Sequence, residues 1–588
     1  MQKTYIILFF YLIIFPVNAQ FNYERSWGTY YGDEMVQYRS SCIDAIGNLY
    51  IVGSISKLDE NLFPLSTPNS HQPIYGGGEK DGFIVKFNPE GNLVWSTYFG
   101  GNDSDYIGDI LIIRNDIYII GETQSTNGIA TSNAYQLELN NTRNHFISKF
   151  NIDGEIIWST YFGSSSPQNS IIINDRSKTV GLTADEDENI YFYSNIQTDN
   201  LSTNGVFQEN RADSRFLLSK FTGEGQRIWS TYYGVNASQI SSIASTSTGI
   251  IVAGQSVDCP PFFQPNTYFA TINAHQINPG SCSDAFISKF SFDGQRIWST
   301  YYGGTSNEWT WSYSGEILAI NNSIYLGSIT SSNNNITTPN SFQPEKDPGT
   351  SHFLVKFNDE GERVWGTYVG KQPNASGFTG FEMTSFLTSD NESNILLSGS
   401  TVSSVNIATL GSYQENITSS SDNFVIKFTP EGNRLWGTYY GGLSPDFFGQ
   451  TQWFDNSFYL IGSTKSQTMI STPNAYQPNY ISNNLGYSMD YSNISMAKFD
   501  PIPLSTNVNN QNPFVIYPNP TDGKFEIQLT KSTSSNFDIE IHNNLGQLIL
   551  SQKNTSQRAF YLKDVAHGLY FVKIKSEEGI AVEKMIVK

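Results

Sequence analysis

The chain has 588 residues, of which only 15% are charged, and its excess of acidic side chains gives a formal net charge of −20 at pH 7. This balance argues against nucleic acid as a partner and predicts repulsion from anionic membrane surfaces. Three cysteines are too few for a disulfide scaffold. Cys42 is expected to be a buried free thiol, and the sequence leaves open whether Cys259 and Cys282, which flank one insertion, form a disulfide.

Residues 1–19 have the pattern of a secretory signal peptide. Lys3 precedes an apolar run over residues 6–15, and Val17 and Ala19 stand three and one positions before the predicted cleavage site. The apolar run is too short to span a bilayer comfortably. We therefore expect cleavage after Ala19 and no transmembrane segment.

A Trp-x-Thr-Tyr strand introduced by a Lys-Phe hairpin returns seven times, at spacings between 63 and 71 residues. Such self-similarity predicts stacked copies of one supersecondary unit. The seven tryptophans alternate with Thr and Tyr, so we expect them to pack between neighbouring units. They are Trp27, Trp95, Trp158, Trp229, Trp298, Trp365 and Trp436.

Each unit contains about four short apolar stretches bounded by Gly, Asn and Asp, which predicts four antiparallel strands and no helix. In the second unit these are residues 107–113, 117–123, 145–151 and 156–163. Six units carry a glycine in the turn between the third and fourth strands, where a tight hairpin needs positive φ. These glycines are Gly91, Gly154, Gly225, Gly294, Gly361 and Gly432.

The seventh Lys-Phe strand, residues 495–500, has no turn glycine and no Trp strand after it, whereas residues 27–32 form a Trp strand with no hairpin before it. The N-terminal strand is therefore predicted to complete the last unit and close a ring, which removes open sheet edges. An open β-solenoid is the alternative. Over residues 27–500 the repeats resemble the SBBP (seven-bladed β-propeller) family of secreted bacterial proteins, a resemblance that implies architecture and no particular reaction.

After a Pro-, Asn- and Ser-rich linker at 501–512, residues 513–588 read as alternating strands of a small Ig-like β-sandwich. They resemble the type A C-terminal sorting domain of the type IX secretion system of Bacteroidota; the alternative is an ordinary terminal sandwich that binds a ligand. The matching positions are Pro518, Asn519, Pro520, Thr521, Gly523, the turn Leu545, Gly546 and Gln547, Gly568, Leu569, Tyr570, Val572, Lys584, Ile586 and Val587. The resemblance implies that the type IX machinery is a partner and that the chain is secreted or displayed on the outer-membrane surface.

The predicted fold is thus all-β: a seven-bladed β-propeller at 20–500 followed by the sandwich. Within each unit the long connections, such as residues 54–82 and 100–106, share one face of the ring, and the short turns share the other. Binding residues concentrate on loops that a rigid scaffold holds, so the elaborated face is the predicted site.

Aromatic residues outside the repeat pattern are the first candidates on this face. They are Trp309, Trp311, Phe447 and Phe448, which would stack on sugar rings or, alternatively, pack over the neighbouring unit. Asp103 and Asp105 are candidate ligands of a calcium ion, the alternative being ordinary loop polarity. His71, His275, His145 and His352 occupy variable slots of the repeat and are interpreted as structural.

No catalytic residue and no cofactor is predicted, because motif searches for nucleophile elbows, zinc helices and phosphate loops find nothing. The leading hypothesis is a monomeric binding module that recognises a glycan or a surface protein. An extracellular polysaccharide hydrolase or lyase, or a structural adhesin, are the alternatives.

Overall fold

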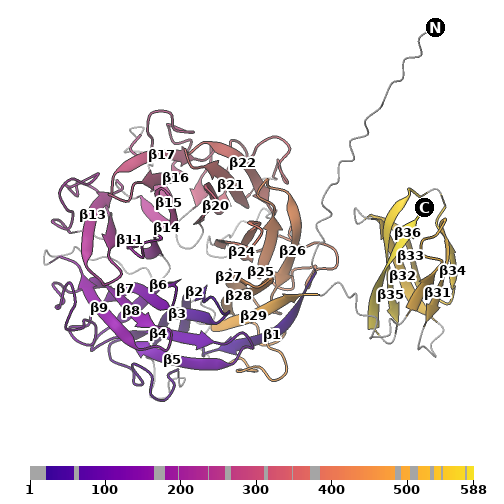
Figure 1. Cartoon of the computed structure of the whole chain (residues 1–588), viewed down its shortest axis with the longest axis horizontal. Coiled ribbons are helices and arrows are strands. Elements are labelled where there is room, and N and C mark those ends of the chain that lie inside the picture. The colour runs from indigo at the N-terminus through magenta and orange to yellow at the C-terminus, as the bar shows by residue number, and fades with distance from the viewer. Residues whose placement is uncertain are drawn as a thin grey trace, which may run out of the picture. The chain divides into compact units, whose positions relative to one another are not determined.

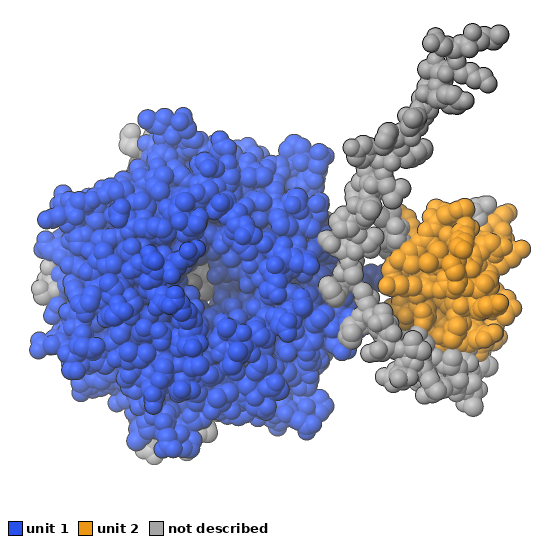
Figure 2. Space-filling model, in the orientation of Figure 1, with its two compact units in different colours: residues 1–502 blue, residues 503–588 orange. Residues whose placement is uncertain are grey.

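The computed structural model describes residues 22–57, 65–164, 179–195, 198–235, 238–257, 267–309, 315–346, 349–370, 384–483, 492–502, 514–529, 536–543, 547–563, 565–576 and 579–588. The predicted signal peptide and the linker beyond residue 502 lie outside these ranges. The chain divides into two compact units, residues 1–502 and 503–588, which Figure 2 colours separately. Every regular element in the described ranges is a strand, and no helix there is long and apolar enough to cross a membrane.

The sheets of unit 1 follow one another around a ring (Figure 1). Six of them use strands that are consecutive in the chain. The first three sheets are β2 (Val36–Ile43), β3 (Leu49–Ser56), β4 (Lys80–Phe87) and β5 (Leu93–Phe99); β6 (Asp105–Ile113), β7 (Asp116–Thr123), β8 (Asn144–Asn151) and β9 (Ile156–Phe162); and β10 (Val180–Ala184), β11 (Ile190–Asn195), β12 (Phe216–Phe221) and β13 (Arg227–Tyr233).

The next three sheets continue in the same way. They are β14 (Gln239–Thr246), β15 (Gly249–Val257), β16 (Ser283–Phe290) and β17 (Arg296–Tyr302); β18 (Glu308–Trp309), β19 (Glu316–Ile320), β20 (Ser323–Thr330), β21 (Ser351–Asn358) and β22 (Arg363–Val369); and β23 (Thr384–Ser389), β24 (Ile395–Thr401), β25 (Asp422–Phe428) and β26 (Arg434–Tyr440).

One further sheet joins the two ends of unit 1. Its order is β1 (Tyr23–Tyr31), β29 (Asn493–Pro501), β28 (Ser457–Thr464) and β27 (Asp446–Phe454). β1 and β29 are antiparallel, with Trp27 opposite Lys498 and Tyr31 opposite Ile494. The innermost strands contact one another in the cyclic order β2, β6, β10, β14, β19, β23 and β27, and β27 contacts β2 again. The face shown in Figure 2 is hollowed at its centre.

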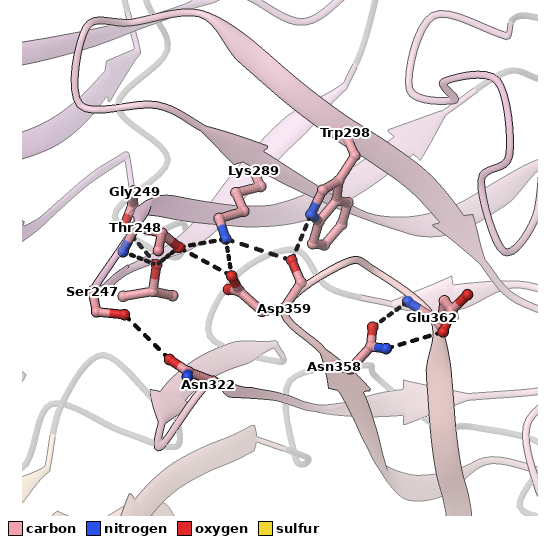
Figure 3. A network of polar contacts seen from close by, with 10 residues as sticks. Ser247, Thr248, Gly249, Lys289, Trp298, Asn322, Asn358, Asp359 and Glu362 are labelled. Atoms are coloured by element: carbon pink, nitrogen blue, oxygen red, sulfur yellow. Dashed lines mark hydrogen bonds and ion pairs between the residues drawn. The ribbon is translucent and has the colours of Figure 1, made fainter.

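The repeat tryptophans join each sheet to the next. At six junctions the indole N–H donates to a carbonyl of the next sheet's outer hairpin turn, at 2.8 to 3.1 Å. Figure 3 shows one junction: Trp298 donates to the Asp359 carbonyl, while the Lys289 ammonium contacts the Asp359 carboxylate and Thr248. The turn glycine, here Gly361 at φ +83°, lies against the indole ring, where a Cβ would come within 2.8 Å. The six turn glycines all have positive φ, as the hairpin pattern predicts.

The long connection between the second and third strands first runs along the outer edge of its own sheet. In every copy this segment has a Thr and, five residues later, a Gln. The backbone of each forms a hydrogen bond with the outermost strand of the sheet. In the first sheet Thr67 N–H donates to the Ser96 carbonyl at 2.9 Å, and Tyr98 N–H donates to the Gln72 carbonyl at 3.1 Å. The same pair of bonds recurs at Thr131/Gln136, Thr203/Gln208, Thr271/Gln276, Thr338/Gln343, Thr409/Gln414 and Thr472/Gln477. These segments cover backbone groups that would otherwise form an open edge.

Unit 2 consists of two antiparallel sheets that share one apolar core. The first contains β30 (Phe514–Tyr517), β31 (Lys524–Leu529) and β34 (Ala559–Tyr561). The second contains β33 (Leu548–Thr555), β32 (Phe537–Asn543), β35 (Gly568–Ser576) and β36 (Gly579–Val587), in that order.

Candidate functional site

The aromatic residues predicted to stack on sugars do not form an exposed platform in the described residues. Phe447 is only 5% exposed, and Phe448 packs against the core of the first sheet at φ +58°. A bulge in β27 between Phe447 and Gln450 interrupts the alternation of inward and outward side chains. Trp309 ends the two-residue strand β18, and Trp311 lies outside the described residues.

The two predicted calcium ligands are separated by burial. Asp103 is exposed, whereas Asp105 is fully buried and accepts hydrogen bonds from Gly101 N–H and the Ser125 hydroxyl, both at 2.7 Å. A Cβ placed on Gly100 would lie 2.6 Å from both Asp105 and Asp81, so these two buried carboxyl groups flank the same glycine. Within the described ranges, no group of three or more His, Cys, Asp and Glu side chains is arranged to hold a metal ion.

Burial sets the charge of this pair. Desolvation, with a smaller contribution from the nearby Asp105 carboxylate, raises the pKa of Asp81 to about 8, and desolvation raises that of Asp105 to about 6. Two similar pairs recur: Asp284 with Glu308, and Asp422 with Asp446. Desolvation raises the pKa of Glu308 to about 8 and that of Asp446 to about 7. These carboxyl groups are buried at junctions between sheets, where a substrate cannot reach them.

The histidines lie in structural positions. The His71 and His275 rings contact Phe150 and Phe357 of the next sheets, at ring-centroid distances of 5.4 and 5.9 Å. His145 and His352 are buried, and burial lowers the pKa of His352 to about 3. The two cysteines in the described ranges differ: Cys42 is free and Cys282 is disulfide-bonded, while Cys259 lies outside the described residues.

Two neighbouring sheets depart from the repeat in the same slot. The slot at the start of the third strand, six residues before the lysine of its Lys-Phe pair, holds Lys80 in the first sheet and Arg143 in the second. The other five sheets carry a small hydroxyl residue there: Ser214, Ser283, Thr350, Ser421 and Ser492. Register places the departures at the elaborated end of the strands, since Lys80 lies opposite Ser56 and Asp105 lies opposite Thr123.

Polar contacts hold the Lys80 side chain at the junction of the first two sheets. Its ammonium lies 3.3 Å from the Gln37 side-chain oxygen and 5.4 Å from the centroid of the Tyr106 ring. Arg39 also donates to the Gln37 oxygen, at 3.3 Å. Close by on the same connection, the Lys57 ammonium lies 5.6 Å from the centroid of the Tyr75 ring. Cations are thus paired with half-buried aromatic rings.

The second sheet contributes Arg143 and the residues that hold it. Tyr106 is the register partner of Glu122, and the Glu122 carboxylate lies 3.6 Å from the Arg143 guanidinium. Thr179 donates to the other oxygen of Glu122 at 2.5 Å. We call Arg39, Lys57, Lys80 and Arg143, together with Tyr75 and Tyr106, the cationic sector. Sequence reasoning missed it, although the replacement of Ser or Thr by a basic residue in two of seven equivalent slots was a readable signal.

The sorting-signal positions of unit 2 come together from the two ends of the domain. The Asn519 side chain donates to the Lys584 carbonyl at 2.6 Å and accepts from Ile586 N–H at 2.9 Å. Thr521 N–H donates to the Ile586 carbonyl, and Lys588 N–H donates to the Thr521 carbonyl, both at 2.8 Å. Gly523 N–H donates to the Thr521 hydroxyl, and the buried Tyr570 donates to the Ala566 carbonyl. Leu545 and Gly546 lie outside the described residues.

Comparisons with known proteins identify the C-terminal region. Residues 515–588 match the family model described as "Secretion system C-terminal sorting domain". None of the curated proteins matches the chain.

Among solved structures, the phage phi92 endosialidase is similar with a TM-score of 0.37 and 9% identity, covering 96% of this chain and 87% of that one. The polysaccharide lyase Uly1 is similar with a TM-score of 0.33 and 10% identity, covering 82% of this chain and 98% of that one. A duf4221 family member from Bacteroides vulgatus is similar with a TM-score of 0.28 and 11% identity, covering 64% of this chain and 93% of that one. Scores this low describe a distant likeness and carry no argument about function.

The class of the protein follows from the sorting domain. The chain is an extracellular protein that a type IX secretion system exports, to be displayed on the cell surface or released. Its unit 1 is an all-β assembly of mostly four-stranded antiparallel sheets.

Proposed function

We propose that unit 1 is a seven-bladed β-propeller of the SBBP type that serves as an extracellular binding module, recognising a glycan or a surface protein through its elaborated face. The observation that carries this proposal is the cationic sector. Its slots hold hydroxyl residues in the other sheets, so Lys80 and Arg143 are not needed to build the repeat.

The repeated residues support this assignment by having structural roles. The tryptophans and turn glycines join neighbouring sheets, and the Thr and Gln of the long connections cover sheet edges. A residue that breaks such a pattern without breaking the fold is a candidate for recognition, because binding residues concentrate where a rigid scaffold holds loops and strand ends in place.

An enzyme remains the alternative, and the described residues offer it little support. Acid–base chemistry on a glycan needs carboxyl groups that a substrate can reach. The carboxyl groups of Asp81, Asp105, Glu308 and Asp446 are fully buried. Tyr38 on the inner strand β2 is buried as well. Burial raises the pKa of its hydroxyl, and this opposes its use as a base.

The test exposes the purified full chain to a panel of polysaccharides and records both retained protein and released reducing ends. Retention without product supports the binding module. Release of product would overturn it in favour of a hydrolase or lyase. Retention of no glycan, together with loss of cell attachment when the gene is deleted, would instead favour a structural adhesin.

We also propose that residues 1–19 are removed after export across the inner membrane, that residues 501–512 form a linker, and that unit 2 is an Ig-like sandwich recognised by the secretion machinery. Removing residues 513–588 should leave the protein trapped in the periplasm, as immunoblots of cell fractions would show. The truncated protein appearing on the cell surface would contradict this assignment.

A further inference from the structure

We propose that the cationic sector binds a negatively charged sugar of an acidic polysaccharide, with Lys80 and Arg143 meeting the charged group and Tyr106 lying against the sugar ring. This inference rests on the proposed function, which it narrows from glycans or surface proteins to polyanionic glycans.

The first argument is that neighbouring groups fix the cations in place. The Lys80 ammonium is held between the Gln37 oxygen at 3.3 Å and the face of the Tyr106 ring at 5.4 Å. The Arg143 side chain is 14% exposed and is held by the Glu122 carboxylate at 3.6 Å. Side chains that are already ordered lose less conformational entropy when a ligand binds.

The second argument is the local charge. The chain as a whole carries −20, so a polyanion is repelled by most of its surface. The cationic sector has four basic side chains, and the acidic side chains of Glu79, Asp103, Asp105 and Glu122 lie near them. The buried Asp81 adds little negative charge, because desolvation favours its protonated form at neutral pH. The charges of the sector are therefore close to balanced, whereas the rest of the chain is acidic, so a polyanion meets less repulsion here than elsewhere.

The third argument concerns shape. Tyr75 and Tyr106 are half-buried, and each lies beside an ammonium group, at 5.6 and 5.4 Å. An acidic sugar presents both surfaces that such a pair can use, a charged substituent for the cation and an apolar ring face for the aromatic side chain. A neutral sugar would use only the aromatic ring.

The experiment uses the purified full chain and two matched pairs of polymers: polygalacturonate with its methyl ester, and dextran sulfate with dextran. Affinities are measured at low and at physiological salt. We expect binding of at least one charged member and not of its neutral partner, with affinity that falls as salt rises. The two pairs distinguish a carboxylated from a sulfated ligand.

The variant Lys80→Ser/Arg143→Ser places the residue of the other sheets in both slots, so the fold should be kept. Since a hydrogen bond to a charged group contributes about 1.5–3 kcal/mol, affinity for the charged polymer should fall about tenfold or more for each cation removed. The matched control is Arg114→Ser, which removes an exposed charge from the turn between β6 and β7 on the opposite face and should leave binding unchanged.

Equal binding of charged and neutral partners, or unchanged affinity of the double variant with a normal melting temperature, would overturn the inference. Binding of neutral glycans that survives the double variant would overturn it while leaving the proposed function intact. Failure of every glycan to bind would overturn the inference and would limit the proposed function to recognition of a surface protein.

Discussion

Six junctions of the ring and the junction before the closing sheet solve the same packing problem differently. At the six, an indole N–H meets a turn carbonyl and the ring lies against a glycine. At the seventh, the closing sheet has no such turn, and Tyr23 occupies the space, with ring centroids 5.0 Å from Trp436. The Trp436 N–H is buried and has no hydrogen-bond partner in the described residues. Because the N-terminal strand β1 closes the ring, the closing sheet lacks the outer hairpin turn and the hydrogen bond that Trp436 would donate to it.

Other contacts offset this loss. Arg25 of β1 donates to the Met469 and Ile470 carbonyls, at 2.7 and 2.8 Å, and lies over the Tyr413 and Tyr440 rings. Thr472 N–H donates to the Gly28 carbonyl, which covers the outer edge of β1 as in the other sheets. The closing sheet thus depends on aromatic stacking and on long-range hydrogen bonds where the others depend on a local turn.

Deleting residues 20–32 is expected to have the largest effect, because it removes the whole of β1. Burying one large side chain of this kind contributes about 1.5–3 kcal/mol. Tyr23, Tyr30 and Tyr31 are all buried, so their combined loss approaches the total stability of a domain, about 5–15 kcal/mol. Calorimetry should show no cooperative transition for unit 1. The control, deletion of residues 513–588, removes more chain and should leave that transition unchanged.

Raising the pH should weaken the junctions that contain buried carboxyl pairs. The native state keeps protons on Asp81, Asp105 and Asp446 in the range where an unfolded carboxyl, with a pKa near 4, has lost them. Because the native state binds more protons, stability is highest below about pH 4 for these groups and falls as pH rises toward about 8. The loss should be on the order of a few kcal/mol, measured by urea unfolding at pH 5 and pH 9.

Single substitutions show how much each junction contributes to this pH dependence of stability. Asp81→Asn should flatten the pH dependence at an ordinary junction, and Asp446→Asn should flatten it at the closing one. Asp422→Asn alters the partner carboxyl at the closing junction, which accepts hydrogen bonds from Gln414, Thr418 and Ser419, so this variant should be less stable than the wild type. Identical slopes for wild type and Asp81→Asn would contradict the assignment.

Gly361→Ala tests the contact that the closing sheet lacks. An alanine would adopt φ +83° and place its Cβ 2.8 Å from the Trp298 ring. Gly205→Ala is the matched control, with φ +77° and nothing within 4 Å of the new Cβ. Both variants should lose about 1–2 kcal/mol of unfolding free energy for the left-handed backbone. The Gly361 variant should lose about 1–3 kcal/mol more for the overlap; equal losses would show that the ring does not depend on this contact.

The smallest expected difference separates Trp298→Phe from Trp436→Phe. Both lose similar volume, but only Trp298 loses a hydrogen bond, to the Asp359 carbonyl. The Trp298 variant should therefore be less stable than the Trp436 variant by about 1 kcal/mol, measured by chemical denaturation. A larger loss at Trp436 would mean that its indole N–H has a partner after all.

Sequence alone predicted the local features well, because strand periodicity and turn glycines depend on neighbouring residues. Gly361 and Trp298 are examples, and the pairing of β1 with β29 followed from a count of unmatched hairpins. The Thr and Gln edge contacts were missed, although the spacing is constant, because they join Thr67 to Ser96 across an irregular connection.

The candidate site was harder to predict. Whether Phe447 is buried depends on a bulge that its own alternating pattern does not reveal. The Asp81–Asp105 pair and the cationic sector both arise from contacts between sheets, which a single repeat cannot show. Comparing each slot across the seven copies would have singled out Lys80 and Arg143.

The pairing of β1 with β29 also fixes an order of events during folding. Most sheets of unit 1 can form as soon as their own consecutive strands are available, whereas β1 must wait for a partner at the far end of the chain. Closing so long a loop carries the largest chain-entropy cost in the molecule. Meanwhile β1 resembles β22 and β26 in sequence and matches any Lys-Phe strand. Mispairing is disfavoured because each of those Lys-Phe strands forms a short hairpin with the Trp strand that follows it, which costs less chain entropy than pairing with distant β1. Among the described strands, β29 is the Lys-Phe strand with no such local partner.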